Sequence, residues 1–376
     1  MENLNHDFPL STLKPWKRLV LQITKPSWEI VALGFVPSSQ FIFLNYDGWK
    51  FKWLIKYLKR KLFIKITGQD KFILESIPKS ARRLLWINLS APSLGDSIMD
   101  LSGRAVLSEF QVDLLTDKKN AALYEKDQTF RHVFSEVVDA RNAHLLEPYD
   151  LIIVDAFSPK IIKIKRRIAP YAPFVGMWGF LNGFEVHRTI YSYKRIQWLL
   201  RAHTFVTKPI LPSMTVSGSS LFKNKSKKPS IAFVVGAEWA FRRYNQWPAV
   251  ISQLIDDYQI VLIGSSNGTK DANEIISKFT SSHNFVDKCN LSETALIISE
   301  VNFVIAADGG LWNIASALGK PSVALFASTF IYDEKNIRIN RDTPDMICET
   351  LYDEHQVSNI DPKEIITAFH RLLKRI

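Results

Sequence analysis

Short apolar runs alternate with polar, helix-like stretches through the first half of the chain. Residues 84–90 (LLWINLS), 112–116 (VDLLT) and 149–156 (YDLIIVDA) have the length and aliphatic composition of buried strands. The stretch 97–110 (SIMDLSGRAVLSEF), between the first two, has the pattern of a helix. Strands that alternate with helices are typical of βαβ units in a parallel sheet. The pattern therefore predicts a doubly wound α/β domain that begins near residue 83.

The same alternation restarts in the second half of the chain. The predicted strands there are 230–236, 259–264, 303–308 and 322–327, and the predicted helices are 248–258, 272–279 and 310–319. The preceding stretch is rich in Pro, Ser and Lys, as expected for an exposed connection between domains. We therefore predict an N-terminal extension (1–82), a first Rossmann-like domain (83–203), a linker (204–229) and a second Rossmann-like domain (230–376).

The length of the chain agrees with this division, because 376 residues exceed the usual size of a single hydrophobic core. Doubly wound domains bind their ligands at the carboxyl ends of the strands. We therefore expect two such domains to face each other across a ligand-binding cleft.

The chain is basic, with 48 Lys and Arg against 37 Asp and Glu and a formal net charge of +11. Phosphate groups of a nucleotide sugar, an anionic lipid or a nucleic acid would suit this charge, and so would solvent alone. Cys289 and Cys348 are the only cysteines and lack a CxxC spacing, which argues against a disulfide framework or a zinc site. The start of the chain has no secretory signal pattern, and no apolar stretch is long enough to span a bilayer. These features predict a cytoplasmic protein.

Residues 49–65 (WKFKWLIKYLKRKLFIK) are basic and aromatic and contain no acidic residue. This composition suits the headgroup region of an anionic membrane, and we expect a surface helix in peripheral contact with the cytoplasmic membrane. A helix whose lysines only face water would have the same composition.

The strongest chemical signal lies in residues 303–329. A strand runs into Asp308, the pair Gly309 and Gly310 permits a tight turn, and a helix begins at once. The free amides at such a helix start form a site for a diphosphate. Taken alone, the two glycines would be equally consistent with an ordinary turn.

This stretch closely resembles the D-[TS]-G-x-x-H-x-A-x-A-L-x-[KR]-P segment of the family 9 glycosyltransferases, the heptosyltransferases, which have the GT-B fold. In that family the segment helps bind the nucleotide diphosphate of the donor. The resemblance implies donor binding by the residues from Asp308 to Asn313, namely Asp308, Gly309, Gly310, Leu311 and Asn313.

A second segment, 236–254, resembles the family's G-A-x-W-x-x-K-R-[WY]-P motif and the helix that follows it. The lysine that contacts donor phosphate in the family falls on Arg242, and Arg243 lies beside it. Guanidinium groups on such a loop could hold a diphosphate through paired hydrogen bonds, or they could form ordinary surface ion pairs. Glu238, in the same loop, is also assigned to the donor side.

A third segment, 84–107, resembles the family's first strand and the G-D-[VL] turn that follows it. Asp96 then aligns with the general base of the family, and Gly95 permits a close turn on the acceptor side. A carboxylate at this position could deprotonate an acceptor hydroxyl. Asp96 could also act as the N-cap of a helix that begins at Ser97.

The three segments occur in family order and cover residues 83–330, so that the first 80 residues lie outside the resemblance. Several positions depart from the family pattern: Gly309 replaces Thr or Ser, Asn313 replaces His, Arg242 replaces Lys and Asn245 replaces Pro. His187 matches a histidine near the end of the family's first domain, and we place it on the acceptor side; a core or interface histidine is the alternative. The four substitutions at Gly309, Asn313, Arg242 and Asn245 lie around the expected donor, so they bear on the identity of the donor rather than on the fold.

A serine hydrolase site is a further alternative. The stretch Gly264–Gly268 (GSSNG) is a GxSxG pattern with Asp308 and His355 later in the chain, the order of a serine hydrolase triad. No Walker motif, Asp-x-Asp triplet or nucleic-acid-binding module occurs, so we expect neither a metal, a cofactor nor a nucleic-acid partner.

The sequence therefore predicts an inverting GT-B glycosyltransferase with Asp96 as base. The resemblance implies transfer of heptose from ADP-heptose to a lipopolysaccharide core or a related lipid-linked saccharide. A transferase for another nucleotide sugar and a catalytically silent glycan-binding relative are the alternatives.

Overall fold

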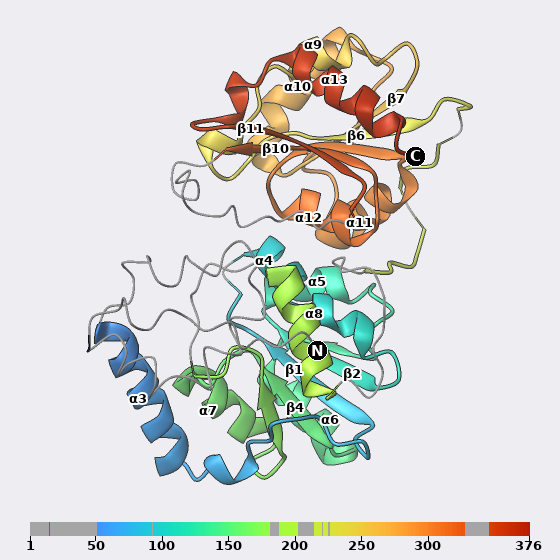
Figure 1. Cartoon of the computed structure of the whole chain (residues 1–376). Coiled ribbons are helices and arrows are strands. Elements are labelled where there is room, and N and C mark those ends of the chain that lie inside the picture. Colours follow the sequence, from blue (N-terminus) through green and yellow to red (C-terminus); the bar gives the residue numbers. More distant parts are fainter. Residues whose placement is uncertain are drawn as a thin grey trace.

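The computed structural model describes residues 15, 51–91, 93–180, 188–201, 214–219, 221–224, 226–327 and 346–376. Two α/β domains, each built on a parallel sheet, lie one above the other (Figure 1). The predicted α/β class and its two doubly wound units are confirmed. Among the described residues no helix has the length and apolar character needed to cross a bilayer.

The first sheet has the strand order β3-β2-β1-β4-β5, and its strands pair in parallel. Its strands are β1 (Arg83–Asn88), β2 (Gln111–Thr116), β3 (Val133–Phe134), β4 (Leu151–Val154) and β5 (Phe174–Gly176). The helices of this domain are α3 (Phe51–Ile66), α4 (Leu94–Asp100), α5 (Lys118–Tyr124), α6 (Val137–Leu146), α7 (Pro159–Ile168) and α8 (Arg188–Leu199), with 3-10 turns η3 (Asp70–Phe72) and η4 (Ser102–Val106).

Side chains of β1 alternate between two apolar layers. Leu84 and Trp86 belong to the core on the side of α4, α5 and α8, whereas Leu85 and Ile87 belong to the core on the side of α3, α6 and α7. Because helices cover both faces, every residue of this strand is buried. This double coverage explains why the strand reads as a continuous apolar run rather than an alternating one.

The second sheet has the order β11-β10-β9-β6-β7-β8, again with parallel pairing. Its strands are β6 (Ser230–Val234), β7 (Gln259–Ile263), β8 (His283–Asn284), β9 (Phe303–Ala307), β10 (Ser322–Ala327) and β11 (Cys348–Asp353). The helices are α9 (Trp247–Ile251), α10 (Thr269–Lys278), α11 (Leu291–Glu300), α12 (Gly310–Ala317) and α13 (Pro362–Leu373), with 3-10 turns η5 (Ala240–Arg242), η6 (Ser266–Gly268) and η7 (Val357–Asn359).

The helix predicted over residues 97–110 is interrupted in the structure. Helix α4 ends at Asp100, and the 3-10 turn η4 follows. A Cβ on Gly103 would lie 2.7 Å from the carbonyl oxygen of Ser192, so α8 can pack this closely only against a glycine. The Ser192 hydroxyl accepts a hydrogen bond from the Gly103 amide and donates one to the Asp100 carbonyl. Tertiary packing with α8 therefore replaces the continuous helix.

The two domains touch through their inner helices. Helix α4 contacts α12 and α5 contacts α11, as Figure 1 also shows. Ser292 donates a hydrogen bond to the carbonyl of Ala122 across this boundary. The inner apolar layers of both domains belong to one connected cluster of buried residues.

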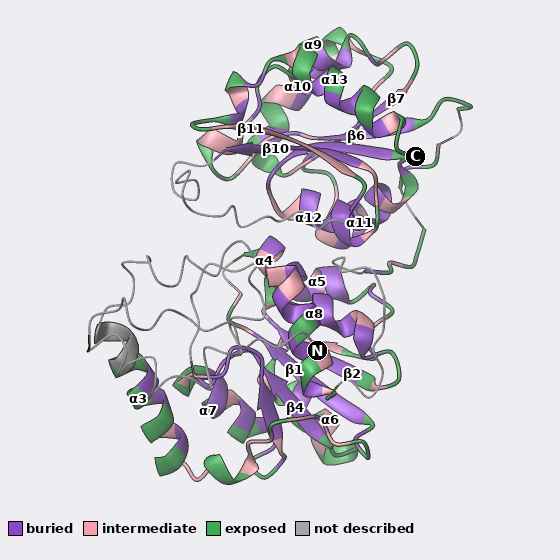
Figure 2. Cartoon of the chain, viewed as in Figure 1, coloured by how far each residue is buried: buried purple, intermediate pink, exposed green. Residues whose placement is uncertain are grey.

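Part of the predicted N-terminal extension is integrated into the first domain. Tyr57 and Ile64 on α3 and Ile77 after it are buried in the domain's cores, and the Leu74 amide donates to the carbonyl of Phe174 in β5. Figure 2 shows that buried and exposed residues alternate along α3. The described part of the predicted linker also packs, because Met214 and Phe222 are buried. The three predicted boundaries between these four segments remain predictions.

Candidate active site between the two domains

Each sheet has one place where the strand order changes direction. In the first sheet this place lies between β1 and β4, and in the second between β6 and β9. Loops at the carboxyl ends of such neighbouring strands diverge and leave room for a ligand. The predicted site residues Asp96, Arg242 and Asp308 all follow one of these strands, so topology gathers them at the domain boundary.

Asp96 lies in the first turn of α4, directly after the loop that leaves β1. The N-cap of this helix is Ser93, whose hydroxyl accepts from the Asp96 amide at 3.3 Å and donates to Asp96 Oδ2 at 2.7 Å. The prediction of a helix starting at Ser97 with Asp96 as its cap is therefore wrong, because the helix begins at Leu94. The carboxylate is 15% exposed and is held by this reciprocal contact.

Arg188, the first residue of α8, bridges two carboxylates of α4. Its Nε lies 3.3 Å from Asp96 Oδ1, and its Nη1 donates to both oxygens of Asp100 at 2.8 and 2.6 Å. Burial raises the pKa of Asp100 to about 6, while Arg188 acts in the opposite direction. Arg188 therefore sets both the orientation and the electrostatic surroundings of Asp96.

A further carboxylate, Asp155, follows β4 at the same switch point. Its Oδ2 accepts from the amides of Leu89 and Ser90 at 2.8 Å, and its Oδ1 accepts from Asn88 Nδ2 at 3.1 Å. Burial raises the pKa of Asp155 to about 7, with the nearby Asp100 contributing. These contacts fix the loop that leads from β1 to Asp96.

Across the boundary, Arg242 and Asp308 meet at the switch point of the second sheet. Arg242 Nη2 lies 3.2 Å from Asp308 Oδ2, and both side chains are mostly buried. The Nε of Arg242 is buried without a hydrogen-bond partner in the described part of the structure. An anionic ligand at this point would satisfy that donor.

The turn after Asp308 has the predicted geometry of a helix start. Gly310 is the first residue of α12 and Gly309 is its N-cap. The amides of Gly310, Leu311 and Trp312 belong to the first turn, where a helix offers no carbonyl partner of its own. Their direction and the helix dipole favour an anion. A Cβ on Gly309 would find its nearest neighbour at 3.9 Å, so the structure leaves room for the Thr or Ser of the family pattern.

The starts of α4 and α12 are in direct contact. A Cβ on Gly310 would lie 3.0 Å from Leu94 Cδ2, and a Cβ on Gly95 would lie 2.7 Å from Asn313 Nδ2. Asn313 is buried and donates to the carbonyl of Gly309 at 2.9 Å. The structure thus brings Gly95, the residue before Asp96, beside Asn313, and Leu94 beside the turn after Asp308.

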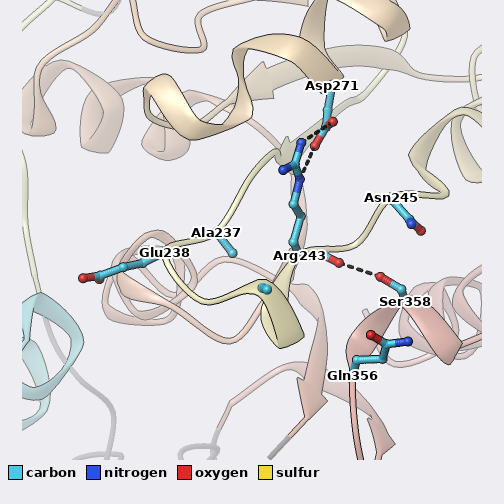
Figure 3. A pocket seen from close by; sticks show the side chains of 8 residues that line it. Ala237, Glu238, Arg243, Asn245, Asp271, Gln356 and Ser358 are labelled. Atoms are coloured by element: carbon cyan, nitrogen blue, oxygen red, sulfur yellow. Dashed lines mark hydrogen bonds and ion pairs between the residues drawn. The ribbon is translucent and has the colours of Figure 1, made fainter.

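Arg243 has a different environment from Arg242. Its Nε and Nη2 donate to the two oxygens of Asp271 at 2.9 and 2.6 Å, an arrangement visible in Figure 3. The pair belongs to the lining of a hollow of about 540 Å³ within the second domain. The hollow is lined by Ala237, Glu238, Ala240, Arg243, Asn245, Asp271, Gln356 and Ser358. Glu238 is exposed at its edge. The structure therefore separates these two predicted donor residues from Arg242 and Asp308, which do not line the hollow.

The loop 236–246 departs from the family register. Gly236 has φ +83°, and a Cβ there would lie 2.5 Å from Asn267 Oδ1, so only glycine fits. Helix α9 begins at Trp247 with Pro248 in its first turn. The aromatic residue and proline of the family motif are therefore Trp247 and Pro248. They lie three residues after Tyr244–Asn245, where the motif alignment places them, so the loop is longer than the motif by that amount.

The hydrolase alternative is incompatible with the topology. Ser266 follows β7 and His355 follows β11, and three strands lie between β7 and β11. At about 4.8 Å per strand the two residues are separated by roughly 19 Å. Asp308 is paired with Arg242, and Gly264 and Gly268 are required by close contact with the Val235 carbonyl. The GxSxG pattern therefore reflects packing.

Three other expectations concern His187, a metal site and a disulfide. His187 lies outside the described residues. The described residues contain no group of three or more His, Cys, Asp or Glu side chains able to hold a metal ion. Cys289 and Cys348 are not linked by a disulfide.

Sequence reasoning missed the supporting residues Asp100, Asp155 and Arg188. Asp155 had a usable signal, because it directly follows an apolar strand just as Asp308 does. Arg188 had none, since its contact with α4 spans 88 residues and depends on how α8 packs.

Comparisons with known proteins agree with this geometry. Residues 195–352 match the model of glycosyltransferase family 9 (heptosyltransferase). Lipopolysaccharide heptosyltransferase 2 of Salmonella typhimurium is 31% identical over 146 residues, covering 34% of this chain and 41% of the relative. The sequence match thus spans less than half of that relative.

Solved structures extend the likeness to most of the chain. Escherichia coli ADP-heptose lipopolysaccharide heptosyltransferase II aligns with a TM-score of 0.59 and 21% identity, covering 78% of this chain and 99% of that one. E. coli heptosyltransferase WaaC with ADP aligns with a TM-score of 0.56 and 14% identity, covering 78% and 98%.

Two parallel-sheet domains that meet at their switch points define the class of GT-B glycosyltransferases, and this chain has that fold. Within this class, residues 195–352, less than half of the chain, are similar to the glycosyltransferase family 9 (heptosyltransferase) model.

Proposed function

We propose that this protein is an inverting glycosyltransferase that moves heptose from ADP-heptose to a lipopolysaccharide core or a related lipid-linked saccharide. The single observation that carries the proposal is the contact between the starts of α4 and α12. At this contact Leu94 lies against Gly310, and Gly95, the residue before Asp96, lies against Asn313. The family domain and the heptosyltransferase relatives supply the sugar and the acceptor class.

In the proposed reaction Asp96 takes the proton of an acceptor hydroxyl. The hydroxyl oxygen forms a bond to the anomeric carbon as the bond from that carbon to the diphosphate breaks, so one displacement inverts the configuration. The first amides of α12 and the Arg242 guanidinium face the negative charge that develops on the departing diphosphate. Arg243 donates both of its bonds to Asp271 and lines the separate hollow, whereas Arg242 lies beside Asp308 and its buried Nε has no partner in the described part of the structure, so the phosphate-binding role falls to Arg242.

The proposed acceptor is lipid-linked, and we therefore propose that the enzyme works at the inner face of the cytoplasmic membrane. No nucleic acid, metal or organic cofactor has a role in this proposal. The nucleotide sugar is a substrate.

Asn313 favours a second candidate, a transferase for another nucleotide sugar. Its side-chain amide is used for a bond to Gly309 rather than left free for a donor, whereas the family pattern has histidine there. A catalytically silent relative would have the same fold but no turnover.

A thermal-shift panel with ADP, UDP, GDP and their sugar derivatives tests the donor class, because a ligand that binds only the folded state raises the apparent stability. We expect selective stabilisation by ADP and ADP-heptose. Selective stabilisation by UDP or GDP would instead support the second candidate. Release of the nucleoside diphosphate in the presence of a lipid-linked acceptor, measured by mass spectrometry, separates an active enzyme from a silent relative.

A further inference from the structure

Helix α3 carries an apolar stripe on its solvent side. Ile55, Leu58, Leu62 and Ile66 are 39, 48, 58 and 74% exposed, respectively. Their spacing of three and four residues places them along one face of the helix. Four large aliphatic side chains in a row on a surface helix are unusual, because single exposed apolar residues are the norm.

The opposite face of α3 fixes the helix to the first domain. Tyr57, Arg60 and Ile64 are buried there. Arg60 donates to the carbonyl of Phe180 at 3.0 Å, and the ring of Tyr57 packs edge-on against the Phe180 ring. At 100° per residue these three side chains lie about 180° from the stripe. The stripe is therefore not the packing face of the helix, which already has its own core contacts.

Lysines flank the stripe on both sides. By the same helical geometry Lys56 and Lys59 lie along one edge and Lys61 and Lys65 along the other, and all four are exposed. Helix α3 contains no acidic residue. An apolar strip between two rows of lysines is the arrangement of a helix that lies in a membrane interface.

The neighbouring helix α7 extends the basic surface. Lys160, Lys163, Arg166 and Arg167 are exposed, and α7 also lacks acidic residues. The two helices are in contact, with Lys163 Nζ 5.9 Å from the centre of the Phe63 ring (Figure 1). Eight exposed cations on two adjacent helices without a single carboxylate of their own favour an extended anionic partner.

We propose that the outward face of α3 docks on an anionic lipid bilayer. In this arrangement Ile55, Leu58, Leu62 and Ile66 enter the headgroup region, and the cations of α3 and α7 contact lipid phosphates. The charge complementarity and the length of the stripe select a bilayer over a soluble partner. The surface lies outside the proposed catalytic site, so the proposal does not depend on which sugar is transferred.

Vesicle co-sedimentation of the full-length protein tests the proposal. The wild type is expected to bind phosphatidylglycerol–phosphatidylcholine vesicles, to bind phosphatidylcholine vesicles weakly, and to be released as salt is raised. Changing Lys59, Lys61 and Lys65 together to Gln should weaken binding to the anionic vesicles on the order of 100-fold. Leu58→Gln with Leu62→Gln should weaken it about 10- to 30-fold through lost apolar contact.

Matched controls come from exposed residues elsewhere. Lys227→Gln, Lys363→Gln and Lys374→Gln remove the same charge from the predicted linker and the second domain, and Leu145→Gln with Leu146→Gln change two leucines of α6 that are more exposed than Leu58 and Leu62. Both controls should bind as the wild type does. All the changed side chains are exposed, so unchanged thermal unfolding should confirm that the variants fold.

Three results would overturn the proposal. The first is a wild type that does not bind anionic vesicles, and the second is a leucine variant that binds as tightly as the wild type. The third is a wild-type dimer, seen by analytical ultracentrifugation, that the leucine changes convert to a monomer, because the stripe would then be an interface between two copies of the chain. Donor-induced thermal shifts are measured without lipid, so failure of the proposed function would be seen separately.

Discussion

Replacing Arg188 with Ala should destabilise the first domain by about 2 to 4 kcal/mol at pH 7. The Arg188 side chain is 24% exposed and makes two short bonds to Asp100 and one contact with Asp96. Removing one partner of a buried ion pair costs about 3 to 5 kcal/mol, and the partial exposure of Arg188 reduces this figure. For a domain of this size each kcal/mol shifts Tm by about 2 to 4 °C, so the expected fall in Tm is roughly 5 to 15 °C.

The pH dependence of the stability loss and a second substitution show whether the loss comes from the unpaired Asp100 carboxylate. The pKa of Asp100 is about 6, so at pH 5 this carboxyl is mostly protonated and no longer needs the guanidinium. The stability deficit of Arg188→Ala should therefore be smaller at pH 5 than at pH 8. Adding Asp100→Asn should restore more than half of the deficit at pH 8, because it removes the unpaired charge.

Lys278→Ala, which breaks an exposed pair with Glu274, should change stability by under about 0.5 kcal/mol. Urea unfolding followed by circular dichroism measures all four proteins. Equal deficits at the two pH values, or no recovery in the double variant, would refute the proposed buried ion pair.

Three further predictions follow from the site. Asp96→Asn should keep the fold and donor binding but lower transfer roughly 10²- to 10⁴-fold, measured as product formation by mass spectrometry, and near-normal turnover would remove Asp96 from the mechanism. Arg242→Ala should weaken binding of ADP more than binding of adenosine in isothermal titration, because only ADP presents charge, and equal losses would mean that Arg242 acts through folding or base contacts. The pKa of Asp155 is about 7 in the folded protein, whereas its ordinary value is 3.8. Between about pH 4 and 7 the folded protein therefore keeps a proton that the unfolded chain has released. Stability should therefore fall as the pH rises through this range, and Asp155→Asn should flatten that dependence in urea unfolding at pH 5 and 8.

The central strands could be predicted because of how they are buried. β1, β4, β9 and β10 are covered on both faces, so each reads as a short continuous apolar run. The outer strands lack this signal. β3 and β8 are two residues long, and β11 is an edge strand of half-buried residues with the mixed sequence CETLYD. Strands of this kind are defined by their neighbours rather than by their own composition.

The candidate site divides in the same way. Asp96, Asp308 and the two glycines after it lie in local strand-turn-helix units, and their positions follow from the sequence around them. The different partners of Arg242 and Arg243 could not be predicted from the sequence around them, because the loop 236–246 is longer than the motif alignment predicts. The side chain of Arg242 turns to Asp308 after β9, and that of Arg243 turns to Asp271 in α10. Which of two adjacent arginines faces the domain boundary is decided by this backbone path.

In the proposed reaction the two domains supply groups of opposite charge. The switch point of the first sheet holds the carboxylates Asp96, Asp100 and Asp155, whereas that of the second offers the helix start of α12 and the guanidinium of Arg242. A carboxylate can take the proton of the acceptor hydroxyl, and a positive potential stabilises the negative charge on the departing diphosphate. Neither half alone could carry out the proposed displacement, since the two act on opposite sides of the same anomeric carbon. Their alignment depends on the contacts of Gly310 with Leu94 and of Gly95 with Asn313, where an added Cβ would require the Leu94 and Asn313 side chains or the two helices to shift. The glycines at this boundary therefore matter for the distance between base and leaving group as well as for the turns in which they lie.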